Sequence, residues 1–141
     1  MKDKAFLDTN IIVYSFDKNN TDKKEIAINL ISNSLKNESG CISFQVVQEF
    51  LNVALRRFNP AFSIEQSQQY LSVVLDPLCE IYPSFDLYRN TLEIKERWKY
   101  SFYDSLIITA ALYSNCKILY SEDLQHEQKI QDLQILNPFI I

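Results

Sequence analysis

The chain has 141 residues, of which 47% are hydrophobic and 23% charged, with a formal net charge of −4. Its single glycine excludes Gly-rich phosphate-binding loops, and its single histidine excludes an HExxH zinc site and twin-histidine acid–base chemistry. The length predicts one domain across residues 1–141, and the net negative charge offers no basic surface for strong non-specific nucleic-acid binding.

The cellular location is indicated by the cysteines and by the distribution of apolar residues. Three cysteines without a CxxC pair are typical of buried thiols in a reducing compartment. Charges in the first ten residues replace the apolar stretch of a signal peptide, and the longest nearly apolar run, at 106–113, is too short for a membrane span. We therefore expect a soluble, cytoplasmic protein that has no membrane partner.

Short apolar strands alternate with helices along the chain. The pattern predicts a strand at 4–7, a helix at 26–35 opened by an Asp22-x-x-Glu25 capping box, a strand at 41–44 and a helix at 46–58. It then predicts a helix to about 75 capped by Ser63-x-x-Gln66, a strand at 79–82, helices at 84–98 and 103–113, and strands at 117–120 and 133–136. This alternation predicts an α/β sandwich with a mainly parallel sheet covered on both faces.

Four carboxylates fall where such a sheet gathers its ligand sites, beyond the carboxyl ends of the strands. Asp8 follows the first strand, and Glu49 lies near the start of the helix after the second. Asp104 opens the apolar helix, and Asp123 follows the strand at 117–120. Each also has an ordinary structural explanation, as a helix cap, a first-turn acid or a turn residue. The prediction of a site therefore depends on the convergence of all four.

In a cluster of carboxylates, either some of the acids are protonated or a cation lies among them. Two carboxylates about 4 Å apart repel by roughly 4 kcal/mol at an effective dielectric of 20. Hard oxygen ligands favour Mg²⁺ or Mn²⁺ over zinc, and either ion activates water for attack on a phosphoryl group. Without these four acids, the remaining 14 acidic residues equal the 14 basic ones, so the net negative charge is local to the predicted site.

Four stretches of the chain together resemble the PIN domain family, especially its VapC-like ribonuclease toxins. They are Phe6-Leu7-Asp8-Thr9-Asn10, the segment Ser43 to Phe50, Phe102 to Ile107 with the following Ala110-Ala111, and Leu119 to Leu124. The resemblance extends from Ala5 to Phe139 and implies a PIN-like fold.

The resemblance also implies a function and a set of site residues. It implies a metal-dependent endoribonuclease with Asp8, Glu49, Asp104 and Asp123 around Mg²⁺ or Mn²⁺, supported by Thr9, Asn10 and Ser121. Chemistry and family together make Asp8 and Asp104 the central ligands, while Glu49 and Asp123 hold a second ion or orient water. The substrate would be RNA, and the partner a small antitoxin that offers an arginine or lysine to the acids.

Several alternatives remain open at this stage. An antitoxin is expected to dock on the apolar helices at 26–35 and 47–58, and the same helices are able to form a homodimer instead. Two other functions fit the same pattern: a housekeeping RNA-processing nuclease and a non-catalytic scaffold that binds RNA or protein. An aspartyl-phosphate phosphatase is disfavoured, because it needs a second Asp two residues after Asp8 and this chain has Asn10 there. Arg97 and Lys99 are the predicted RNA phosphate contacts. Glu122 is an alternative to Asp123 as the acid that faces the metal, although Asp123 fits the spacing better.

Overall fold

A computed structural model describes residues 3–140 and contains a six-stranded sheet in the order β3-β2-β1-β4-β6-β5. The strands are β1 (Ala5–Leu7), β2 (Gly40–Ser43), β3 (Cys79–Ile81), β4 (Ile118–Tyr120), β5 (Lys129–Ile130) and β6 (Leu133–Leu136). The helices are α1 (Thr9–Tyr14), α2 (Thr21–Asn37), α3 (Phe44–Arg56), α4 (Ile64–Tyr70), the π-helix η1 (Leu71–Leu75), α5 (Asp76–Leu78), α6 (Phe85–Trp98) and α7 (Phe102–Tyr113).

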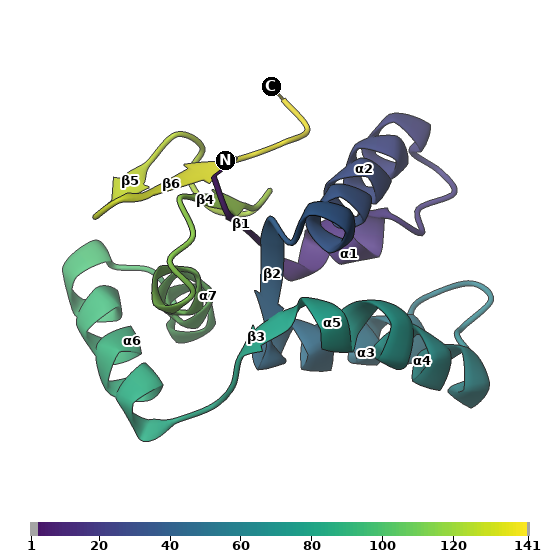
Figure 1. Cartoon of the computed structure of the whole chain (residues 1–141), viewed down its shortest axis with the longest axis horizontal. Coiled ribbons are helices and arrows are strands. Elements are labelled where there is room, and N and C mark those ends of the chain that lie inside the picture. The colour runs from purple at the N-terminus through teal and green to yellow at the C-terminus, as the bar shows by residue number, and fades with distance from the viewer. Residues whose placement is uncertain (1–2, 141) are drawn as a thin grey trace.

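The sheet is parallel except at one edge, where β5 pairs antiparallel with β6. Figure 1 shows α1 and α2 on one side of β1 and β2, with α6 and α7 on the other. Strand β1 lies in the middle and is buried throughout, because both of its faces are covered by helices. The predicted α/β sandwich with a mainly parallel sheet is confirmed.

Three local predictions differ from the structure. Helix α2 begins earlier than expected, because the side chain of Asn20 rather than Asp22 accepts a hydrogen bond from the backbone and caps it. The helix opened by the Ser63 and Gln66 capping box does not stop before Asp76, but continues through η1 into α5. Strand β5 was not predicted, since two residues are too short to show an alternating pattern.

The single glycine lies where a helix approaches the sheet closely. A Cβ atom built on Gly40 would lie 2.0 Å from Ser34 Oγ and 2.5 Å from Ser34 Cβ. Ser34 is buried, and its hydroxyl donates to the carbonyl of Leu30 within α2. Glycine at this position therefore allows α2 to pack directly against β2.

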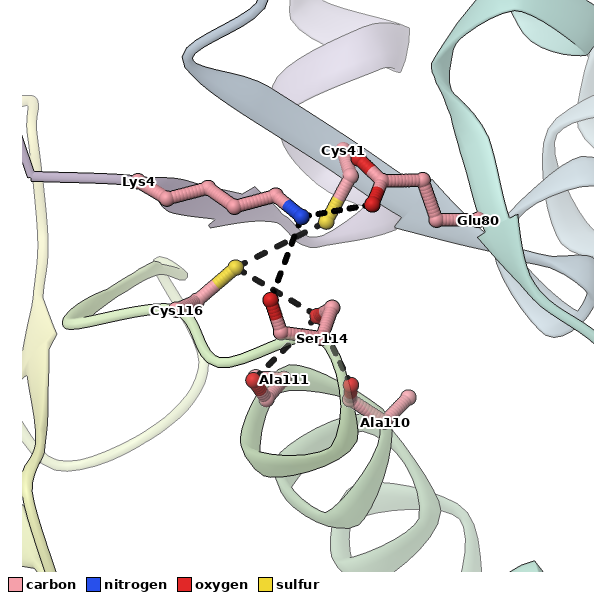
Figure 2. Close-up of polar contacts among 7 residues, drawn as sticks. All are labelled: Lys4, Cys41, Glu80, Ala110, Ala111, Ser114 and Cys116. Atoms are coloured by element: carbon pink, nitrogen blue, oxygen red, sulfur yellow. Dashed lines mark hydrogen bonds and ion pairs between the residues drawn. The ribbon is translucent and has the colours of Figure 1, made fainter.

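The cysteines are free thiols, as predicted, and two of them are buried together. Figure 2 shows Cys41 and Cys116 beside Lys4, with their sulfur atoms 3.6 Å apart. Lys4 Nζ donates to Glu80 Oε1 at 2.5 Å and to the carbonyl oxygen of Ser114 at 3.1 Å. The contact with Cys116, together with burial, raises the pKa of the Cys41 thiol, which therefore stays protonated at neutral pH.

Among residues 3–140, no helix combines the length and the apolar character needed to cross a bilayer.

Candidate acidic site

All four predicted carboxylates line one open cavity of about 280 Å³ beyond the carboxyl end of β1. Asp8 caps α1, Glu49 projects from α3, Asp104 lies in the first turn of α7, and Asp123 follows β4. The sheet order explains their meeting, because β2 and β4 flank β1 on opposite sides and so bring the following segments to one edge.

Asp8 is the carboxylate most affected by its surroundings. Its Oδ1 accepts from the backbone N–H of Thr9 at 2.7 Å, and its Oδ2 accepts from Ser121 Oγ at 2.8 Å. Burial raises the pKa of Asp8 to about 6, against the opposing effect of these two hydrogen bonds, and the charges of Glu49 and Asp123 raise it further. Asp8 therefore has both of the roles considered for it, because it caps α1 and also lines the cavity.

The other predicted supporting residues each hold one of the acids. Thr9 Oγ1 donates to Glu49 Oε1 at 2.5 Å, and Asn10 Nδ2 donates to Asp123 Oδ2 at 2.7 Å. Together with Ser121, these contacts fix three of the four carboxylates by neutral donors. Neutral donors orient a carboxylate without removing its charge, so it keeps its attraction for a cation.

Glu122 does not belong to the cavity, although it is adjacent in sequence to Asp123. Its carboxylate accepts from Tyr14 Oη at 2.6 Å and pairs with Lys23 Nζ at 2.5 Å. These contacts lower the pKa of Glu122, although partial burial acts against them. Asp123 is therefore the acid that lines the cavity, as the spacing predicted.

The carboxylates of the cavity have no basic partner. None of the ion pairs formed within residues 3–140 includes Asp8, Glu49, Asp104 or Asp123. Among residues 3–140, Arg57 is the one basic residue that lines the cavity. The predicted phosphate contacts Arg97 and Lys99 are not part of this lining. Arg97 lies in the last turn of α6 over the Trp98 ring, and Lys99 pairs with Glu96 at 3.7 Å.

The donor set fits a hard divalent cation, although the side chains are not gathered around one point. Within the described chain, no three carboxylate, thiol or imidazole groups are close enough together to hold a metal ion. Burial is the largest cause of the raised pKa of Asp8, and the charges of Glu49 and Asp123 raise it further. The oxygen-only chemistry of the lining acids is that of a Mg²⁺ or Mn²⁺ site.

Four polar residues outside the predicted set of site residues also line the cavity: Gln45, Asn52, Arg57 and Tyr103. A signal for two of them was present, since Gln45 and Asn52 lie four residues before and three after Glu49 and so share its face of α3. Gln45 is buried, and its Nε2 donates to the Tyr103 carbonyl at 3.2 Å and to Glu49 Oε2 at 3.4 Å. No local pattern marks Tyr103 or Arg57.

Comparisons with known proteins identify a family and a fold. A family model for the PIN domain matches residues 5–130. Similar solved structures include VapBC2 from Rickettsia felis bound to a promoter DNA fragment, with a TM-score of 0.63 and 23% identity over 93% of this chain and 96% of that chain. VapBC-1 from nontypeable Haemophilus influenzae has a TM-score of 0.62 and 24% identity, covering 95% of this chain and 97% of that chain.

A third similar structure is Mycobacterium tuberculosis VapC20, a sarcin–ricin loop cleaving toxin. It has a TM-score of 0.60 and 17% identity, covering 85% of this chain and 90% of that chain. None of the curated proteins compared with the chain matches it significantly. At these identities, the similarity to solved structures establishes the fold alone.

Proposed function

The chain belongs to the PIN domain family, and from that premise we propose that it is a metal-dependent endoribonuclease in which residues 1–141 form one PIN-like domain. The observation that carries the proposal is the cavity lined by four carboxylates that have no ion-pair partner. RNA is the proposed substrate because the similar VapC20 is a toxin that cleaves the sarcin–ricin loop.

Asp8, Glu49, Asp104 and Asp123 would hold the divalent ion or ions, with Asp8 and Asp104 as the central ligands. Bound Mg²⁺ or Mn²⁺ supplies Lewis acidity to a phosphoryl oxygen and lowers the pKa of water. Asp8 would hold the ion in its ionised form, since a positive charge beside it would offset the burial and like-charge effects that raise its pKa.

The remaining polar residues position these acids. Ser121 is fully buried, and its hydroxyl donates a hydrogen bond to one Asp8 oxygen. This contact holds the Asp8 carboxylate in one orientation. Thr9 and Asn10 perform the same role for Glu49 and Asp123. Preorganised donors of this kind reduce the cost of reorientation when substrate binds. Arg57, exposed at the cavity, is placed to attract an RNA phosphate.

The similar VapBC structures support a toxin function restrained by a small antitoxin. An open groove of about 770 Å³ adjoins the acidic cavity and shares Asn10, Val53 and Arg57 with it. Its apolar wall includes Val13, Phe16 and Phe62. An antitoxin segment with an apolar face would occupy this groove and extend an arginine to the acids, where guanidinium pairs in bidentate fashion with carboxylate.

The groove coincides with only part of the docking surface that was expected from the sequence. The expected docking surface comprised the helices at 26–35 and 47–58, whereas the groove is lined by the segment from Asn10 to Asn19, the end of α3 and the following loop. Helix α2 contributes none of its lining, because its buried residues pack on the core instead.

The nuclease proposal is tested by cleavage of a labelled single-stranded RNA with Mn²⁺ or with EDTA. Asp123→Asn should reduce kcat more than about 100-fold, which exceeds the usual effect of removing an outer-shell partner of a metal. Glu122→Gln is the matched control and should keep wild-type cleavage, since its carboxylate pairs with Lys23. Equal activity of both variants, or cleavage that persists in EDTA, refutes the assignment.

The partner proposal needs a separate experiment. The chain is co-expressed with the small gene that neighbours its own, and a stable complex with loss of RNA cleavage is expected. Val13→Glu, which places a charge in the groove, should abolish co-purification but leave cleavage by the chain alone intact. If the chain cleaves RNA but neither slows growth when induced nor co-purifies with the neighbouring gene product, the nuclease proposal stands and the toxin proposal is refuted.

A further inference from the structure

A second cavity, of about 230 Å³, adjoins the acidic one and shares two of its lining residues, Gln45 and Tyr103. It lies between the start of α3, the segment between β3 and α6, and the first turns of α7. Its lining includes Ser43, Phe44, Gln45, Tyr82, Phe102 and Tyr103. The cavity is therefore adjacent to the carboxylates, but its own lining is mainly aromatic and apolar.

Its walls carry aromatic rings that remain open to solvent. Tyr82 is 55% exposed, Tyr103 65% and Phe44 39%. The ring centroids of Phe44 and Tyr82 are 6.0 Å apart, and those of Phe102 and Tyr103 are 5.3 Å apart. Exposed aromatic faces beside a phosphodiester-binding site are suited to stacking on unpaired bases.

Two residues of the cavity lining each carry a buried polar atom that has no hydrogen-bond partner among residues 3–140. Ser43 Oγ and Gln45 Oε1 form no hydrogen bond within residues 3–140, and their residues are 3% and 8% exposed. The Gln45 amide nitrogen is already committed to Glu49 and Tyr103, so its oxygen remains as an acceptor. A buried polar atom left unpaired is costly, so a ligand that brings complementary groups to these two side chains gains by pairing with them.

The size and chemistry of the cavity define that ligand. Its volume of about 230 Å³ is below the roughly 300–1,000 Å³ of sites for drug-sized molecules, so it suits one planar ring system. The edge of a nucleobase combines an aromatic face with N–H donors for Gln45 Oε1 and with groups that pair with the Ser43 hydroxyl. A base held here would leave its sugar and phosphate near Gln45 and Tyr103, the residues that line both cavities.

We propose that this cavity is a nucleobase subsite, which holds an unstacked base of single-stranded RNA beside the phosphate to be cleaved. The inference rests on the proposed nuclease function and assigns base recognition to residues outside the carboxylate set. Gln45 connects the two cavities, because it lines both of them and its side-chain nitrogen contacts Glu49.

The first test uses ribonucleosides in EDTA, where cleavage plays no part and a neutral ligand is not repelled by the acids. Saturation-transfer NMR should show contact through the base protons of at least one of adenosine, guanosine, cytidine and uridine, with ribose as the control. Tyr82→Leu should abolish the signal. Phe85→Leu is the matched control and should not alter it, because Phe85 is 80% exposed and lies outside the cavity lining.

Ser43→Ala separates recognition from folding. The Ser43 hydroxyl makes no hydrogen bond and provides no side-chain cap for α3, so the folded protein loses no contact when it is removed. Nucleoside affinity should fall about 2- to 10-fold, the effect of one hydrogen bond. Unchanged affinity in both Ser43→Ala and Tyr82→Leu, or no base contact by any nucleoside, refutes the subsite.

The second test uses cleavage. An RNA in which one nucleotide next to the mapped cleavage point is abasic should be cut with kcat/KM at least about fivefold lower, the loss expected from one stacked base. Tyr82→Leu should reduce this discrimination. Equal cleavage of intact and abasic RNA refutes the subsite but leaves the nuclease function standing. Nucleoside binding without any RNA cleavage supports the subsite and refutes the nuclease function.

The oligomeric state of Tyr82→Leu tests another role for the aromatic rings. If this variant converts a dimer to a monomer and leaves the base preference unchanged, the rings serve contacts between copies of the chain, and the subsite is refuted.

Discussion

Replacing Asp8 with asparagine should stabilise the metal-free protein while removing its activity. Burial and the charges of Glu49 and Asp123 raise the pKa of Asp8 from 3.8 to about 6. At a pH above both values, this difference corresponds to a cost of about 3 kcal/mol for keeping the group ionised in the folded state. Asparagine avoids that cost and still accepts from the Thr9 N–H, so we expect a gain of about 1–3 kcal/mol at pH 7.5.

The gain has a defined dependence on pH. Because the pKa of Asp8 is higher in the folded state than in the unfolded state, the folded protein binds this proton more tightly. The contribution of Asp8 to stability is therefore most favourable below about pH 4 and declines as the pH rises through about 6. The difference between Asp8→Asn and wild type should be small at pH 4, grow between pH 4 and 6, and level off above pH 7.

Urea unfolding in EDTA at a series of pH values measures this difference, provided that the m-values agree between the two proteins. Asp132→Asn is the matched control, since Asp132 is exposed in the turn between β5 and β6, and should show no such change. Two results would overturn the reasoning. One is a less stable Asp8→Asn protein at pH 7.5, and the other is a gain of the same size at pH 4 and pH 7.5.

Three further predictions concern the metal, a supporting hydroxyl and the glycine. Mn²⁺ at about 100 times its Kd should raise the free energy of unfolding of wild type by about 2.7 kcal/mol, and that of Asp104→Asn by less, as measured by urea titration. Ser121→Ala should lower kcat for RNA cleavage about 10- to 100-fold with an unchanged circular dichroism spectrum, because it releases one Asp8 oxygen. Gly40→Ala should cost about 1–3 kcal/mol in the same titration by forcing a side chain against Ser34, and the cost should shrink in a Ser34→Gly background.

The positions of the four acids could be predicted because each depends on local information. A short apolar strand followed by a capping residue places Asp8, and helical spacing places Glu49 and Asp104. The expected convergence at one sheet edge follows from the general geometry of parallel sheets and needs no knowledge of strand order. The family resemblance led to the same residues by an independent route.

The errors arose where two local signals competed. Asp22 and Glu25 match a capping box, but Asn20 caps the helix because its side chain reaches the N–H of Lys23. Asp76-Pro77 suggests a helix end, yet proline is acceptable in the first turn of the short α5 that follows η1. In each case the competing signal lay within a few residues of the predicted one.

By itself, the sequence determined the fold class, the four carboxylates and the oxygen chemistry of their site, because hydrophobic spacing and capping act between near neighbours in the chain. Only the tertiary structure decided which neighbours complete the site. Ser121 and Asp8 are 113 residues apart yet hydrogen-bonded, and Arg57 rather than Arg97 lines the cavity. These pairings depend on the order of the strands and the packing of helices between them, which the local pattern of residues does not encode.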